Sequence, residues 1–342
     1  MSTVRMGSCL LSMAALLFTP ALTISAQDKP LGPERIRQGA VAGLRVIEKS
    51  AAAYPNQRTC FSCHHQTLPM QAMVVARQHG FTINDALLQS QTKLTRDSFK
   101  ARVMNLKEGT GIGGRSMTVG FGLWALNLGG GKTDETTSAM ISFLLKDQEA
   151  DGHFSSNLSR PPLEDSIVTS TTIAAYYMQK FVTAEKKGEV ERSVQIAREW
   201  LIQAQPKSQE DRNSKLWGLH LLGAGRPDME KAHEAVLQNQ RTDGGWSQLP
   251  LMESDAYATG QTLFVLQESG LSASTPAYQR GLQFLLNTQL TDGSWQVKTR
   301  SKPVQTYYES DFPHGKDQFI SISATSWAVA ALAANCLPST PN

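Results

Sequence analysis

The segment that decides the fold reads Phe284-Leu-Leu-Asn-Thr-Gln289-Leu-Thr-Asp-Gly293-Ser-Trp295. It combines a helix end, a glutamine, an Asp-Gly turn and an aromatic residue. Glycine permits the left-handed turn that ends a helix, and aspartate favours turns through hydrogen bonds to nearby backbone. The aromatic side chain then fills the corner between two helical hairpins. The segment therefore predicts a helix end followed by a sharp return of the chain.

The same order of residues occurs twice more. The glutamines of these copies are Gln148 and Gln240, and their aromatic residues are Phe154 and Trp246. A second helix follows each turn. Aligning the second helices gives six equivalent starting positions, at His65, Arg115, Asp165, Asp211, Asp255 and Ser321. Most neighbouring starts are about 45 to 50 residues apart, a period typical of repeated helical hairpins.

The two helices of each hairpin differ in composition. First helices, such as residues 280–289, are amphipathic, which predicts an outer layer. Second helices, such as residues 320–334, are rich in Ala, Ser and Thr, which predicts an inner layer packed on both sides. We therefore expect an all-α, single-domain fold over residues 27–342. Six hairpins can form an open solenoid or close into a ring.

The sixth hairpin resembles the repeat motif of squalene-hopene and oxidosqualene cyclases. The matching positions are Arg280, Gly281, Phe284, Leu285, Gln289, Gly293 and Trp295, with partial matches in segments 231–246 and 138–154. This resemblance implies the α/α toroid that those cyclases share with protein prenyltransferases. Fold alone does not transfer an activity.

The chemistry of these families is only partly matched. Squalene-hopene cyclases protonate their substrate with an Asp-x-Asp-Asp motif, and the nearest counterpart here is Glu253-Ser254-Asp255-Ala256. Protein prenyltransferases hold zinc with Asp, Cys and His, whereas beyond the first hairpin this chain has only Cys336. We expect the resemblance to be structural. The alternative is a terpenoid cyclase or other isoprenoid-processing enzyme, with Asp165 or Asp255 as the acid for an apolar small-molecule substrate.

The first residues predict export. Arg5 precedes a short apolar stretch, Pro20 interrupts it, and Ile24-Ser25-Ala26 suits signal peptidase. We expect a signal peptide at residues 1–26, cleaved near Ala26, a periplasmic or secreted protein, and no transmembrane segment in the mature chain. The 33 basic and 30 acidic residues form no basic block, which argues against a nucleic-acid partner.

Residues 60–64 carry the most specific chemical motif. Cys60-Phe-Ser-Cys63-His64 has the spacing of c-type haem attachment, in which two thiols bind the haem covalently and the histidine binds iron. Haem c would give an exported protein a redox or ligand-sensing role and a redox partner. A further alternative for the chain is a non-catalytic binding module with a structural metal. Two alternatives remain open: a zinc site using Cys60, Cys63 and His64 or His65, and a Cys60–Cys63 disulfide or a purely structural cap.

A long loop interrupts the last hairpin. Residues 296–316 add about 20 residues to the repeat period, which is typical of a binding loop or lid. Ring closure would bring hairpin six beside hairpin one, so we expect the loop to fold over the haem. His314 is then the favoured distal iron ligand, with Met70 and Met252 as rivals.

Closure of the ring would also collect polar residues at one mouth of a central cavity. These are His65, Arg115, Asp165, Asp211 and Asp255, each at the start of a second helix. They predict either a polar ligand site or, for the aspartates, ordinary helix capping. Three tryptophans of the second helices, Trp124, Trp217 and Trp327, are expected to pack and not to stack on a ligand.

Overall fold

The computed structural model describes Met1, residues 31–303 and residues 306–336. The predicted signal peptide and its cleavage near Ala26 lie outside the described residues, apart from Met1. In the described part of the chain, the regular secondary structure is helical, with three isolated β-bridges in the turns. No helix of this part is long and apolar enough to cross a membrane.

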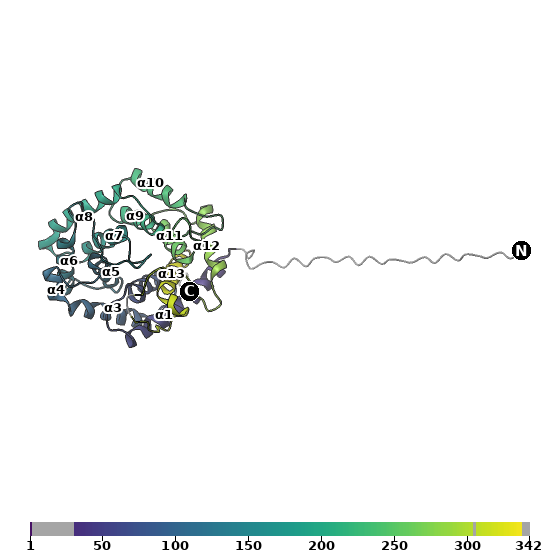
Figure 1. Cartoon of the computed structure of the whole chain (residues 1–342), viewed down its shortest axis with the longest axis horizontal. Helices are drawn as coiled ribbons and strands as arrows, with labels where there is room; N and C mark the ends of the chain where they lie inside the picture. Colours follow the sequence, from purple (N-terminus) through teal and green to yellow (C-terminus); the bar gives the residue numbers. More distant parts are fainter. Residues whose placement is uncertain (2–30, 304–305, 337–342) are drawn as a thin grey trace. The chain divides into compact units, whose positions relative to one another are not determined.

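Twelve of the helices pair into six hairpins, as the repeat predicts. The outer members are α1 (Pro33–Ala53), α3 (Asp85–Lys100), α6 (Glu135–Asp147), α8 (Lys187–Gln203), α10 (Arg226–Leu237) and α12 (Pro276–Thr288). The inner members are α2 (Leu68–Gln78), α5 (Arg115–Leu128), α7 (Ile167–Met178), α9 (Gln209–Leu221), α11 (Ala256–Glu268) and α13 (Gln318–Ala333). A short helix, α4 (Val103–Glu108), follows α3. Figure 1 shows the two concentric layers.

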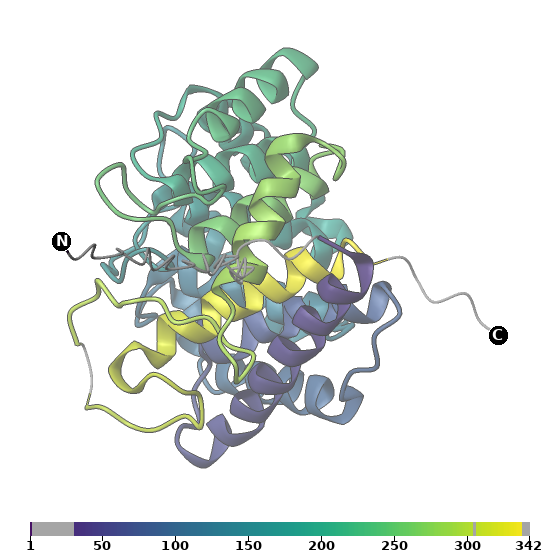
Figure 2. The ribbon, with the colours of Figure 1, turned by 90° about the vertical axis from the view of Figure 1, so that its right-hand side faces the viewer.

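The hairpins close into a ring. Each inner helix contacts the next one, and α13 contacts α2. In the outer layer, α1 packs against α12 and also covers α13, so the first and last hairpins are neighbours. Figure 2 shows α1 lying along α13. The fold is therefore an α/α toroid, which confirms the predicted class and settles the choice between ring and solenoid.

The three copies of the repeat segment form equivalent hydrogen bonds through their glutamine side chains. The Nε2 group of Gln289 donates to the carbonyl of Gly293 in its own turn and to that of Gly39 in α1, at 2.9 Å each. Gln240 makes the same two bonds, to Gly244 and to Ala277 of α12, and Gln148 bonds Gly152 and Ser193 of α8. Each glutamine therefore ties one hairpin to the next.

The turn itself leaves little room for other residues. Gly293 has φ +91°, and a Cβ placed on it would lie 2.6 Å from the carbonyl oxygen of Ala42 in α1. Two residues further on, Trp295 is 1% exposed, and its indole N–H donates to the carbonyl of Leu285. Glycine thus provides both the left-handed turn and the close approach of the next outer helix.

We expect Gln289→Ala to lower the free energy of unfolding by about 1–3 kcal/mol, because two carbonyls lose a donor at the ring closure. Urea unfolding followed by circular dichroism measures the change. The matched control is Gln195→Ala on the exposed face of α8, where the amide bonds only Glu199. That control should change stability by less than about 0.5 kcal/mol. An equal effect of both substitutions would contradict the bridging role.

Candidate functional site

The Cys60–His64 motif leads into an irregular start of α2. Residues Cys63–Thr67 form a single π-helical turn, and the hydroxyl of Ser62 accepts a hydrogen bond from the backbone of His65. Single π turns often mark functional positions in helices. Cys60 is exposed, whereas Cys63 is buried, and both thiols are free.

Cys63 belongs to a buried polar chain. Its thiol donates to Oε1 of Glu164 at 2.6 Å, and Oε2 of Glu164 accepts from Arg160 at 2.9 Å. Burial, and then the neighbouring carboxylate, raise the pKa of the Cys63 thiol well above its usual value. The thiol is therefore protonated at neutral pH, and this environment does not activate it as a nucleophile.

His64 and His65 are both neutral imidazoles near pH 7. Burial, followed by the charge of Arg160, lowers the pKa of His64 to about 3, and burial lowers that of His65 well below its usual value. The two Nδ1 atoms face each other, and the ring of Phe319 lies 5.1 Å from that of His64. Within the described residues, Nε2 of His65 has no hydrogen-bond partner.

A cavity of about 580 Å³ lies against His64. Most of its wall is apolar or aromatic, and three cationic side chains line it as well. The lining residues are His64, Arg160, Pro161, Leu163, Glu164, Thr299, Ser301, Lys302, Pro303, Thr306, Tyr307, Lys316, Phe319 and Ile320. The motif and the loop at 296–316 therefore share one cavity, although they are far apart in the sequence.

Hydrogen bonds fix the loop across this mouth of the ring. Arg300 donates to the side chain of Gln248 in hairpin five, and the hydroxyl of Ser301 donates to the carbonyl of Pro161 in hairpin three. The backbone N–H of Thr299 donates to Asp317 at the start of α13. Residues 304 and 305 are outside the described part of the chain. The loop thus spans several hairpins at the inner-helix N-termini.

The three expected distal ligands lie elsewhere. Met70 is fully buried within α2, and Met252 lies in the turn before α11. His314 uses Nε2 to bond the hydroxyl of Ser294. None of the three is among the described residues that line the cavity. Direct coordination by any of them would need a rearrangement of its surroundings.

The polar residues at the starts of inner helices serve different roles. Asp255 caps α11 by accepting from the N–H of Ala258, and Asp211 belongs to the capping box of α9. Arg115 forms an ion pair with Asp147 of the outer layer at 2.7 Å. Asp165 is exposed, and its neighbour Ser166 provides the cap of α7. Capping therefore accounts for Asp211 and Asp255, but not for Asp165.

Sequence reasoning missed the most buried acid at this mouth. Glu210 is 4% exposed and accepts hydrogen bonds from Thr169 at 2.7 Å and from the hydroxyl of Tyr257 at 3.0 Å. Burial raises the pKa of Glu210 to about 7, and burial raises that of Asp255 to about 6. Glu164 and Glu210 each directly precede a residue that the repeat alignment selected. A search that included adjacent residues would have found both.

Aromatic side chains fill the middle of the ring. The Trp124 ring in α5 lies 5.0 Å from that of Trp217 in α9 and 6.1 Å from that of Trp327 in α13. In the ring of inner helices, α7 lies between α5 and α9, and α2 lies between α5 and α13 (Figure 1), so these contacts join helices that are not direct neighbours. Trp124 packs against both Trp217 and Trp327, as expected.

The described residues contain no group of three or more His, Cys, Asp or Glu side chains arranged to hold a metal ion. The four residues of the proposed zinc alternative illustrate the difficulty. Cys60 is exposed, Cys63 faces Glu164, and His64 and His65 face each other. This arrangement gives no support to the zinc alternative.

No protein-family model and no curated protein matches the chain. Solved structures do match it. The type II terpene cyclase MstE from Scytonema, in its apo form, has a TM-score of 0.57 at 14% identity, over 89% of this chain and 98% of that one. A glycosidase variant in complex with glucose has a TM-score of 0.54 at 12% identity, over 90% and 100%.

A third match is ent-copalyl diphosphate synthase from Streptomyces platensis. Its TM-score is 0.50 at 18% identity, over 77% of this chain and 50% of that one. At such identities the likeness shows the fold alone. The chain is thus a toroid with the architecture of terpene cyclases and of some glycosidases, two classes with different chemistry.

The buried Glu210 should give the protein a measurable pH dependence. Its folded pKa, about 7, lies above the usual 4.5, so the folded state binds the proton more tightly. Stability is then full below about pH 4.5 and falls as the pH rises through 7, by up to about 3 kcal/mol.

We therefore expect Glu210→Gln to be more stable than the wild type at pH 8, with the difference vanishing near pH 4.5. Urea titrations at several pH values measure this. The exposed Glu191 on α8 provides the control Glu191→Gln, which should follow the wild type at each pH. A constant offset across this range would rule out titration of Glu210 as the cause.

Proposed function

We propose that this chain is an exported haem c protein with a redox or ligand-sensing role. In this proposal Cys60 and Cys63 bind the haem covalently, and His64 is the iron ligand. The observation that carries the proposal is the cavity of about 580 Å³ against His64, with apolar walls and three cationic side chains. Apolar walls suit a porphyrin, and cations suit its two carboxylate groups.

The donor set fits haem chemistry. His64 is a neutral imidazole, which is the form that binds iron. Both cysteines are free thiols, as thioether formation requires. Cys63 now contacts Glu164, and Cys60 lies 3.7 Å from the hydroxyl of Tyr54, so attachment requires both thiols to turn toward the cavity. When bound, haem would supply one-electron transfer or ligand binding at iron.

The protein's own residues would hold and shield the group. Arg160, Lys302 and Lys316 would pair with its carboxylates, although Arg160 already shares its charge with Glu164. The rings of Phe319 and His65 both pack against the ring of His64. The loop tied to Pro161 and Gln248 would exclude water from one side of the site and leave a surface for a redox partner.

Expression with a c-type haem maturation system tests the proposal. We expect the mature protein to gain the mass of one haem, which acid–acetone does not extract. The double variant Cys60→Ser/Cys63→Ser should lose covalent haem, whereas Cys336→Ser, which removes the third free thiol, should keep it. An unmodified mass from cells that mature a co-expressed cytochrome c would overturn the proposal.

A second candidate is an enzyme that protonates an apolar isoprenoid. Glu210 favours it, because a buried carboxyl with a pKa of about 7 is still about half protonated at neutral pH. One solved neighbour, a single-residue variant of the Scytonema cyclase MstE, is described in complex with geranylgeranyl dihydroxybenzoate as substrate. The packing of Trp124 against Trp217 and Trp327 limits the space inside the ring that such a substrate could fill.

Incubation with squalene and with geranylgeranyl dihydroxybenzoate, followed by mass analysis of products, tests this candidate. If the chain is a cyclase, Glu210→Gln should reduce product formation by about 100-fold or more. The variants Asp255→Asn and Asp165→Asn examine the weaker candidate acids. Absence of a cyclic product from the wild type, in samples whose fold is verified by circular dichroism, would exclude cyclisation of these substrates.

A further inference from the structure

The geometry points to a second binding site, for an organic ammonium ion, at the opposite mouth of the ring. It lies at the C-terminal ends of the inner helices and is independent of the proposed haem site. Its cavity, of about 580 Å³, shares no lining residue with the cavity beside His64.

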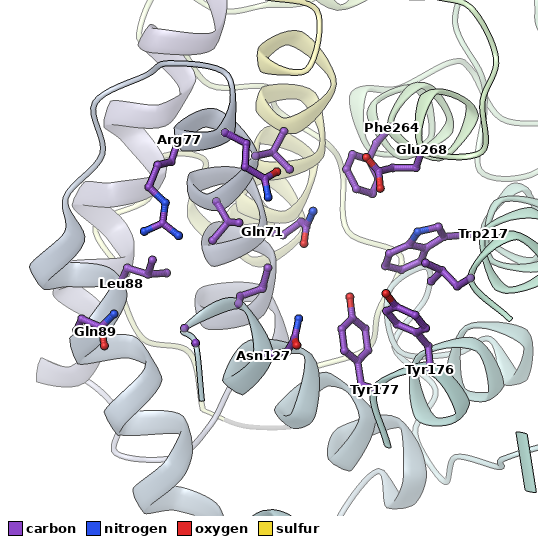
Figure 3. Close-up of a pocket in the computed structure, with 17 residues that line it drawn as sticks. Gln71, Arg77, Leu88, Gln89, Asn127, Tyr176, Tyr177, Trp217, Phe264 and Glu268 are labelled. Atoms are coloured by element: carbon purple, nitrogen blue, oxygen red, sulfur yellow. The ribbon is translucent and has the colours of Figure 1, made fainter. Parts of the chain in front are cut away.

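This second cavity is built from the last turns of five inner helices. Lining residues come from α2, α5, α7, α9 and α11, with additional ones from α3 and from the turn after α5. Figure 3 shows Tyr176, Tyr177, Trp217, Phe264 and Glu268 arranged around one side of the space, with Gln71 and Asn127 facing them. The ring closure thus brings residues from five hairpins to a single concave surface.

Four of these residues are aromatic and come from three consecutive inner helices. The rings of Tyr176 and Tyr177 lie 4.9 Å apart, and those of Trp217 and Phe264 lie 6.0 Å apart, both pairs in edge-to-face geometry. Aromatic faces attract cations. Tyr176 already attracts one cation, because Nζ of Lys180 lies 4.5 Å from its ring centre, so an ammonium ligand would replace Lys180 there as well as contact the other rings. An aromatic wall of this kind suits an ammonium group.

Charge at this mouth also favours a cation. The C-terminal end of each helix carries a partial negative charge, and five such ends meet here. Glu268, the last residue of α11, adds a carboxylate, and no ion pair among the described residues involves it. The cationic Arg77 is offset by Asp85 at 3.1 Å.

Burial and two neighbouring histidines influence the charge of Glu268. Burial raises the pKa of Glu268, and His220 and His79 lower it. His79 also bonds the carbonyl of Cys336 through Nδ1. The carboxylate of Glu268 and the C-terminal ends of the five helices give this mouth a negative local field. A neutral polyol could use the amides of Gln71 and Asn127, but it would gain nothing from that field.

Calorimetry with two probes of equal shape tests the proposal on the wild-type chain at pH 7.5. The probes are choline, which carries a trimethylammonium group, and 3,3-dimethylbutan-1-ol, its neutral counterpart. We expect choline to bind about ten-fold or more tightly than the alcohol, because only the cation gains from the aromatic rings and the carboxylate. Equal binding of both, or no choline binding up to about 10 mM, would overturn the proposal.

Two variants locate the site. Glu268→Gln removes the carboxylate and Tyr176→Leu removes a half-buried aromatic face, and each should weaken choline binding by about five-fold or more. Glu191→Gln, which changes net charge equally on the outer helix α8, should bind choline as the wild type does. Thermal unfolding verifies the fold of each variant. Unchanged choline affinity in both pocket variants would place the binding elsewhere and reject this site.

Discussion

The ring depends on one side-chain interaction, the glutamine amide that joins its own turn to the next outer helix. A helical hairpin cannot bury its apolar face alone, so it needs a neighbour held at a fixed distance. Gln148, Gln240 and Gln289 provide this link three times, each donating to a glycine carbonyl of its own turn and to a carbonyl of the next outer helix. Because Gln289 reaches α1, the bond that propagates the repeat also closes the ring.

Ring closure in turn determines which polar residues of distant hairpins come into contact. Cys63 in hairpin one meets Glu164 from hairpin three, and the loop of hairpin six reaches both Gln248 and Pro161. Such contacts between distant segments arise because all inner helices begin at the same mouth. Tryptophans from α5, α9 and α13 pack together inside the ring, and the cavities at the two mouths share no lining residue.

The fold was predictable because its determinants are local. Gln289, Gly293 and Trp295 act within a few residues of one another, and their spacing is visible in the sequence. The candidate site was only partly predictable. The Cys60–His64 motif could be read directly, whereas the inward positions of Glu164 and Glu210 depend on tertiary contacts. Glu164 lies in the bridged turn before α7 and Glu210 in the first turn of α9, and the repeat alignment selected the residue after each, Asp165 and Asp211.

The direction of the inner helices explains why the two mouths differ, because all the helix N-termini lie at one mouth and all the C-termini at the other. Burial decides where the effect of the helix-end charges on a carboxyl pKa is outweighed. Helix N-termini favour anions by about 0.3–1 kcal/mol, which should lower the pKa of a nearby carboxyl. Yet Asp255, at the N-terminus of α11, and Glu210, in the first turn of α9, both have raised pKa values. A rise of two or more pKa units corresponds to about 3 kcal/mol, so desolvation exceeds the helix field. At the opposite mouth burial also raises the pKa of Glu268, but this side chain is more exposed, and its carboxylate adds to the partial negative charge of the helix ends there.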